Sequence, residues 1–209
     1  MVDEITAGLI TSVVRLMVAV FVSYSFFKSR SPPAMYLGLF FILFGIHGWF
    51  RTLSLMTGNE ILFFLHRLAM IFPTVIILQV ISQSVSWISR YKIVFAIAAV
   101  SIILSYVDAF VFGGFVGEAR TLWATIPSFS FSAVGMLMTA YFFNAQKGMP
   151  RLGRNIMAVG FMLQSVLLFA AFLIVRNNLA GVGFYLGLVF TSIIAVGWWM
   201  VREKLDMMS

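Results

Sequence analysis

The chain has no cysteine among its 209 residues. It therefore forms no disulfide, offers no zinc–thiolate site and carries no thiol nucleophile, so any chemistry must rest on other side chains. The absence leaves the redox compartment of the protein open.

Charged residues are also scarce. They make up 10% of the chain, whereas an ordinary soluble domain carries about 25%. Hydrophobic residues make up 62%, and the mean hydropathy is +1.04. A water-soluble fold would have too few polar side chains to cover its surface, so we expect an integral membrane protein with a single domain over residues 1–209.

Common catalytic signatures are missing as well. The sequence contains no H-E-x-x-H, no G-x-S-x-G and no phosphate-binding G-x-x-x-x-G-K-[ST] motif. Among the predicted spans, the only Lys is Lys92, the second residue of 91–112, and none lies in a span interior, which excludes a retinal Schiff base. These absences favour a non-enzymatic protein and leave an enzyme without positive support.

What the chain has is long apolar runs. A transmembrane helix needs about 20 mainly apolar residues to cross roughly 30 Å of hydrocarbon. Seven segments qualify, at residues 5–27, 34–56, 60–83, 91–112, 121–144, 154–175 and 181–201. Turn residues such as Gly58 and Pro150 lie between them and predict short connections. The predicted fold is an all-α bundle of about seven transmembrane helices, each antiparallel to the next.

Lys and Arg are unevenly distributed between the predicted spans. Nine fall on one side, and two, Arg120 and Arg176, fall on the other side with most of the acidic residues. Because basic connections stay on the cytoplasmic side, we expect a cell-membrane protein with its N-terminus outside and its C-terminus in the cytoplasm. The net charge of +7 then predicts contact with the lipid bilayer rather than with nucleic acid.

Away from the ends of the predicted spans, six charged or histidine residues fall inside them, where each marks a candidate functional site because burial in lipid is costly. They are Arg15, His47, Arg51, His66, Arg67 and Asp108. All lie in the outer half of the bundle or near its middle. Since five of the six are basic, we expect an outward-facing cationic cavity that an anionic or amphiphilic small ligand would neutralise. This pattern predicts a non-enzymatic binding or sensing protein.

Each of these residues also has a plainer interpretation. Arg51, near a helix end, is equally suited to reach lipid head groups. Arg67 is equally suited to a structural ion pair with Asp108, and either histidine to a hydrogen bond within the packing. Any signalling output would require a partner subunit or a homo-oligomer, because the short polar C-terminal tail cannot supply it.

A second hypothesis makes His47 and His66 the axial ligands of one b-type haem. These are the only two histidines, and they lie at similar depth on either side of the turn between the second and third spans. Arg51 and Arg67 would pair with the propionates. Because packed helices lie only about 8 to 10 Å apart, the hairpin would have to splay, at Pro73.

A third hypothesis is a small-molecule transporter built as three helices, a linker helix and three more. Residues 24–33 (YSFFKSRSPP) and 141–150 (YFFNAQKGMP) match in Tyr, Phe and Pro positions, and each segment joins two spans. Chance similarity in such a Phe-rich chain is the simpler explanation. The hypothesis predicts that the first three helices superpose on the last three.

Overall fold

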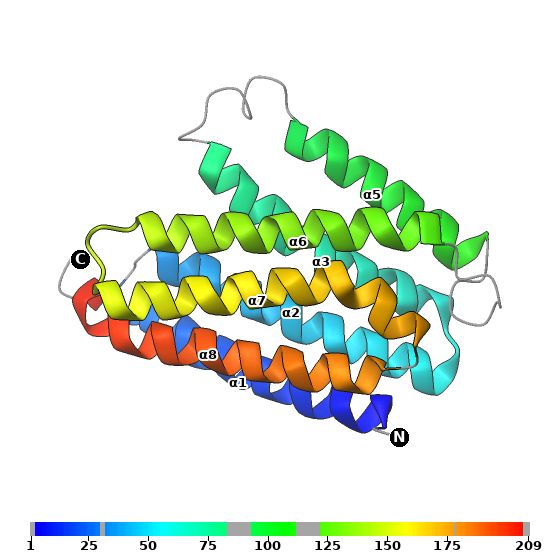
Figure 1. Ribbon diagram of the computed structural model, residues 1–209, viewed down its shortest axis with the longest axis horizontal. Helices are drawn as coiled ribbons and strands as arrows, with labels where there is room; N and C mark the ends of the chain where they lie inside the picture. The colour runs from blue at the N-terminus through cyan, green and yellow to red at the C-terminus, as the bar shows by residue number, and fades with distance from the viewer. Residues whose placement is uncertain (1–2, 30–31, 83–92, 112–121, 178, 207–209) are drawn as a thin grey trace.

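A computed structural model describes residues 3–29, 32–82, 93–111, 122–177 and 179–206. These residues form helices and short connections, with no strand among them. The helices are α1 (Glu4–Ser29), α2 (Pro32–Thr57), α3 (Glu60–Ser82), α5 (Ile93–Phe110), α6 (Leu122–Ala145), α7 (Arg151–Arg176) and α8 (Ala180–Asp206). The structure confirms the predicted all-α bundle (Figure 1).

The predicted spans agree with these helices to within a few residues at most ends. The largest differences are at α7, which begins three residues earlier than predicted, and at α8, which continues five residues beyond residue 201. Residues 83, 91, 92, 112 and 121, at the predicted ends of three spans, lie outside the described residues.

Five helices are long and apolar enough to cross a membrane, judged by length and composition. The qualifying segments are Glu4–Tyr24, Met35–Thr57, Glu60–Leu78, Arg151–Ala171 and Ala180–Arg202. The described parts of α5 and α6 contain shorter apolar segments, Val94–Val107 and Phe129–Ala145. The chain is therefore a polytopic helical membrane protein.

Six of the helices pack as a closed ring. Within the described residues, α1, α2 and α3 are successive neighbours, as are α6, α7 and α8. Contacts of α1 with α8 and of α3 with α6 join the two triplets, while α5, as far as the structure describes the chain, packs only on α3 and α6, outside the ring. In Figure 1, α5 accordingly stands to one side of the other helices.

The turn between α2 and α3 has a specific local cause. Gly58 has a φ of 64°, and its amide donates to the Ser54 carbonyl at 2.8 Å, which ends α2. Asn59 then caps α3, because its Oδ1 accepts a 2.8 Å hydrogen bond from the Ile61 amide. This tight turn sets the two helices antiparallel and brings their polar residues to the same depth.

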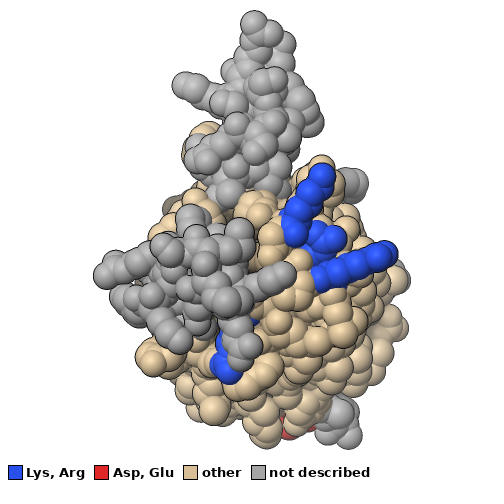
Figure 2. All heavy atoms as spheres, turned by 90° about the vertical axis from the view of Figure 1, so that its left-hand side faces the viewer, with Lys and Arg blue, Asp and Glu red and all other residues tan. Residues whose placement is uncertain are grey.

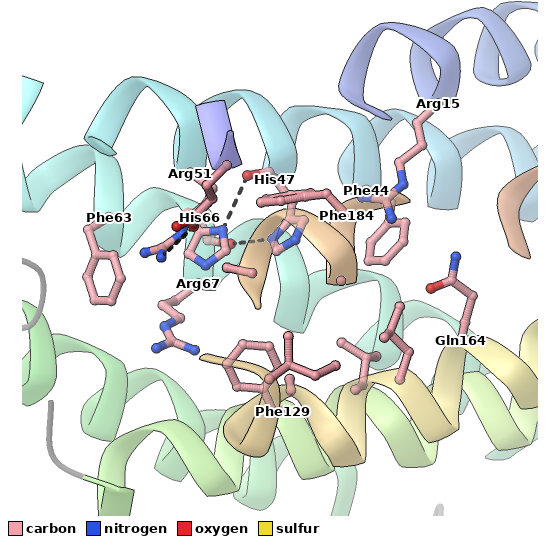
Figure 3. A pocket seen from close by; sticks show the side chains of 17 residues that line it. Arg15, Phe44, His47, Arg51, Phe63, His66, Arg67, Phe129, Gln164 and Phe184 are labelled. Atoms are coloured by element: carbon pink, nitrogen blue, oxygen red, sulfur yellow. Dashed lines mark hydrogen bonds and ion pairs between the residues drawn. The ribbon is translucent and has the colours of Figure 1, made fainter. Parts of the chain in front are cut away.

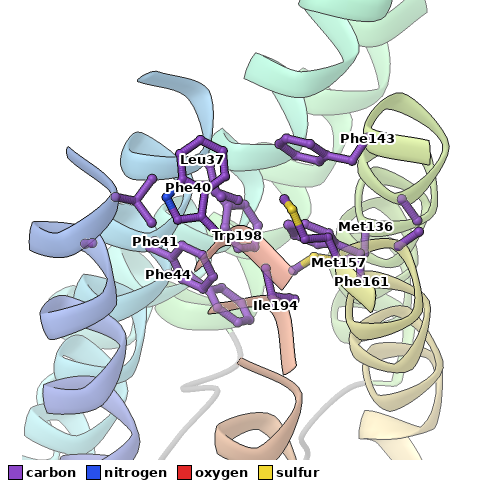
Figure 4. Packing of buried hydrophobic residues seen from close by; sticks show 14 of the residues in the cluster. Leu37, Phe40, Phe41, Phe44, Met136, Phe143, Met157, Phe161, Ile194 and Trp198 are labelled. Carbon is purple, nitrogen blue, oxygen red and sulfur yellow. The ribbon is translucent and has the colours of Figure 1, made fainter. Parts of the chain in front are cut away.

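The ring is filled by an apolar cluster at the end that carries the C-terminus. Trp198, Phe41, Phe161 and Ile194 are fully buried there (Figure 4). Helices α7 and α8 approach closely at Gly197, where a Cβ would lie only 2.7 Å from the backbone nitrogen of Met157. This packing closes one end of the ring and leaves the polar residues at the other.

Candidate functional site

A cavity of about 140 Å³ lies inside the ring, among residues of all six of its helices. Its charged and polar lining comes mainly from α1, α2 and α3, and its apolar lining mainly from α7 (Figure 3). The lining residues are Glu4, Arg15, Phe44, His47, Arg51, Phe63, His66, Arg67, Phe129, Gln164, Leu167, Leu168, Ala171, Ile174, Ala180, Gly183 and Phe184.

The structure brings five of the six predicted site residues together. Arg15, His47, Arg51, His66 and Arg67 all line this cavity, and each is at most 7% exposed. The sixth predicted site residue is Asp108, whose side chain lies outside the described side chains. The predicted ion pair between Asp108 and Arg67 lies outside them too.

Arg15 enters the cavity from the middle of α1, eleven residues after the helix begins, or about 16 Å along its axis. Its guanidinium carbon lies 3.9 Å from the centre of the Phe44 ring, and its Nε donates to Thr191 Oγ1 at 3.4 Å. No carboxylate of the described residues lies within ion-pair distance of it. Arg15 is thus a buried cation whose terminal nitrogens have no acceptor among those residues.

A polar group on α7 and α8 faces the same end of the cavity. Gln164 Nε2 donates to the Gly187 carbonyl at 2.9 Å and to Thr191 Oγ1 at 3.4 Å. Thr191 Oγ1 donates in turn to Gly187 at 2.8 Å. A Cβ at Gly187 would lie 2.7 Å from Arg15 Nη2, so any larger residue there would require the guanidinium to move. This end of the cavity is therefore formed by Arg15 of α1, Gln164 of α7, and Gly187 and Thr191 of α8.

The two histidines form a reciprocal pair across the α2–α3 hairpin. His47 Nδ1 lies 3.3 Å from the His66 carbonyl oxygen, and His66 Nδ1 lies 3.2 Å from the His47 carbonyl oxygen. Because a carbonyl oxygen only accepts, each Nδ1 must carry the proton and donate it. In neutral rings, each Nε2 is then a hydrogen-bond acceptor.

The histidines belong to a row of stacked rings. Phe44 stacks on His47 at 5.3 Å between ring centres, His47 stacks on His66 at 4.3 Å, and Phe63 lies 5.8 Å from His66. Arg15 covers the Phe44 end of the row, and Arg67 lies 5.0 Å from the Phe63 ring centre at the other. The faces of these rings are occupied by one another and by the arginines, so the rings offer mainly their edges to the cavity.

The other end of the cavity holds an ion pair. Arg51 Nη2 donates to Glu4 Oε1 at 2.9 Å, and the Arg51 side chain is only 9% exposed. Arg51 thus turns inward to a carboxylate of the chain rather than outward to lipid head groups. Glu4, Ala180 and Gly183 are half-buried, so the cavity approaches the molecular surface at this end.

Beside this end, Asp3 caps α1. Hydrogen bonds from the Thr6 side chain and the Thr6 amide, the latter at 2.9 Å, hold the pKa of Asp3 below its ordinary value of 3.8.

Sequence reasoning missed several residues of the site. Neither Glu4 nor Gln164 is among the candidate site residues that the sequence predicts. A single Gln in the middle of an apolar run was the available signal for Gln164. The Phe residues had a signal too, because Phe44 precedes His47 and Phe63 precedes His66 by the same three positions, one face of a helix.

A haem does not fit this arrangement. The two imidazole rings are stacked on each other, with ring centres 4.3 Å apart and planes 24° from parallel, so no porphyrin can lie between them. The cavity has about the volume that holds one benzene molecule, far below that of a porphyrin. The described residues also contain no cluster of three or more His, Cys, Asp or Glu that could hold a metal ion.

The fold and the cavity together define a helical membrane protein with a buried, largely apolar cavity whose charged side chains are three arginines and Glu4. In comparisons with protein families, with curated protein sequences and with solved structures, the chain matches none.

Proposed function

We propose that this protein binds a small anion in the cavity, as a non-enzymatic binding or sensing protein of the cell membrane. The observation that carries the proposal is the buried guanidinium of Arg15, which has no counter-charge among the described residues. A buried cation without a counter-charge is costly, and a bound carboxylate or similar anion would supply both the charge and hydrogen-bond acceptors.

The walls of the cavity favour an anion with an apolar part. Leu167, Leu168, Ala171 and Ile174 of α7 line one side, opposite the cationic and aromatic residues of α2 and α3. A wholly hydrophilic anion would leave this apolar side without contacts. An amphiphilic anion satisfies both sides, because its charge reaches Arg15 while its apolar body covers α7.

We further propose that the mouth of the cavity faces outward. The end of the bundle that carries the α6–α7 connection and the end of α8 presents Lys and Arg side chains (Figure 2), among them Lys147 and Arg151. The opposite end, where the cavity approaches the surface, carries Asp3 and Glu4. Basic ends face the cytoplasm, which gives an external N-terminus and a cytoplasmic C-terminus.

The test compares Arg15→Ala with Arg151→Ala, an exposed arginine at the far end of the bundle. Both variants would be purified in lipid nanodiscs and titrated with a series of monocarboxylates. We expect carboxylates to stabilise the native protein and Arg151→Ala, and to bind Arg15→Ala at least about tenfold more weakly. If Arg15→Ala does not fold, Arg15→Lys replaces it, since Lys keeps the charge but not the forked donors. Equal responses of the native protein and the folded Arg15 variant, or none from either, would refute the proposal.

Transport of the same anion is a second candidate, supported by the arrangement of the two triplets. In α1–α2–α3 and in α6–α7–α8, successive helices are neighbours, and the first helix of each triplet contacts the last helix of the other. The cavity lies between the triplets, where repeat-built transporters hold their substrate. Uptake of labelled benzoate into proteoliposomes that is abolished by Arg15→Ala would support transport, whereas binding without uptake would leave the binding role alone.

A further inference from the structure

We infer that the ligand is a carboxylic acid with a single aromatic ring that also carries a hydroxyl or amino group. This inference rests on the proposed anion-binding function and names the chemical class of the anion. It follows from three features of the cavity: the Arg15 guanidinium that would hold the carboxylate, the size and apolar lining of the cavity, and the hydrogen-bond acceptors of the two histidines.

The anchor orients the ligand. Arg15 lies with Gln164 at one end of the cavity, while Arg51 and Arg67 lie toward the other (Figure 3). Arg51 already has the Glu4 carboxylate at 2.9 Å. The carboxylate of a ligand is therefore expected at Arg15, where a guanidinium offers a fork of donors matched to a carboxylate.

Size and walls select the body of the ligand. A volume of about 140 Å³ accommodates one six-membered ring and excludes a long acyl chain. His47 is stacked between Phe44 and His66, so these rings turn their edges to the cavity. The C–H edges of these rings carry partial positive charge and attract the face of another aromatic ring. A flat ring can thus lie between these edges and the apolar side chains of α7.

The histidines select a further group on that ring. Since both Nδ1 atoms donate to backbone carbonyls, the neutral rings present Nε2 acceptors for which the described residues supply no hydrogen bond. A ligand without a donor would leave these acceptors unsatisfied when it displaces water, which costs affinity. A hydroxyl or amino group on the ring supplies the missing donor.

The experiment measures the affinity of nanodisc-embedded protein for five probes: benzoate, 3-hydroxybenzoate, 4-hydroxybenzoate, cyclohexanecarboxylate and decanoate. We expect at least one hydroxybenzoate to bind best, with benzoate weaker by about tenfold and cyclohexanecarboxylate and decanoate weaker still. If cyclohexanecarboxylate or decanoate binds as tightly as the hydroxybenzoates, while Arg15→Ala still abolishes binding, the inference on ligand class is wrong and the anion-binding proposal stands. If no carboxylate binds, the proposed function itself fails.

Two sets of variants locate the ring and its donor group. Ala171→Leu narrows the cavity and should abolish binding of every aromatic acid, whereas Ala170→Leu, its neighbour outside the lining, should not. His47→Phe and His66→Phe should remove the preference for hydroxybenzoate over benzoate, measured as the ratio of the two affinities within each variant. A preference that survives in both histidine variants would refute the role of the Nε2 acceptors.

Discussion

At the scale of single residues, the lack of a side chain at Gly187 has the largest consequence for the site. Because Gly187 has no side chain, the Arg15 guanidinium can lie against α8, close to Thr191 and Gln164. Charge placement inside this membrane protein thus depends on a residue with no charge of its own. The same logic makes the position sensitive to one added methyl group.

Gly187→Ala should weaken carboxylate binding by at least about tenfold while the protein stays folded. The added Cβ would meet Arg15 Nη2 at 2.7 Å, and the flexible arginine would swing away from its position. Ser192→Ala is the control on the same helix, because Ser192 is exposed and does not line the cavity. Isothermal titration with benzoate measures both variants, and equal losses in the two would contradict the role given to Gly187.

The carboxyl of Asp3 provides a pH-dependent prediction. Because its folded-state pKa is lowered, its capping contribution is present above the ordinary pKa of 3.8 and is lost as the pH falls through the lower, folded value. A carboxyl-carbon NMR titration of the native protein should therefore report a pKa below 3.8. Thr6→Ala should raise this pKa toward 3.8, since the side-chain hydrogen bond from Thr6 is the largest cause of the shift. An unchanged titration in Thr6→Ala would contradict this assignment.

At the scale of helices, polar side chains link neighbours through backbone carbonyls. Ser132 of α6 donates to the Met70 carbonyl of α3 at 3.0 Å, and Ser165 of α7 donates to the Ala133 carbonyl of α6 at 2.8 Å. The first link lies one residue from Ala69, whose carbonyl would accept the amide hydrogen that Pro73 lacks, so both carbonyls lie in the turn that the proline disturbs. In a membrane, such side chains satisfy carbonyls that a proline disturbs.

This relation predicts coupling between Ser132 and Pro73. Ser132→Ala should destabilise the native protein by about 0.6 kcal/mol and cost less in a Pro73→Ala background, where α3 can restore its own hydrogen bonds. Ser165→Ala is the control, because its acceptor lies on α6 and its cost should not depend on Pro73. Reversible unfolding in mixed micelles measures each free energy of unfolding. Additive costs for Ser132 and Pro73 would show that the serine does not compensate for the proline.

At the scale of the whole molecule, the two ends of the bundle differ in charge and in packing. The apolar cluster closes the ring toward the basic end, and the cavity opens toward the acidic end. If the basic end faces the cytoplasm, a ligand enters from outside and meets the closed apolar cluster beyond it.

The absence of cysteine makes this orientation directly measurable. Asn59→Cys, in the α2–α3 turn, should react with a membrane-impermeant maleimide in intact cells. Lys147→Cys, in the α6–α7 connection, should react only after permeabilisation. Both positions are exposed, so the difference reports sidedness rather than burial. The reverse pattern would overturn the proposed orientation, and the unsubstituted protein is an unreactive control.

Sequence alone was sufficient to predict the helices and to identify the buried basic residues. Long apolar runs have few alternatives in lipid, because every backbone polar group must be satisfied within the segment, and helices do this locally. An ionisable residue within such a run also stands out whatever the fold, since its burial cost depends on the membrane. Arg15, Arg51 and the two histidines could therefore be chosen as candidates before their neighbours were known.

Only the tertiary structure decided which partners these residues meet. Arg51 pairs with Glu4, and the histidines stack on each other instead of facing an iron. Gln164 and Gly187 lie at the Arg15 end of the cavity. All of these arrangements depend on contacts between different helices. Such contacts follow from how the faces of six helices fit together in one ring. The apolar pattern of the sequence does not specify this fit, because in a membrane the lipid-facing and the buried faces of a helix are similarly apolar.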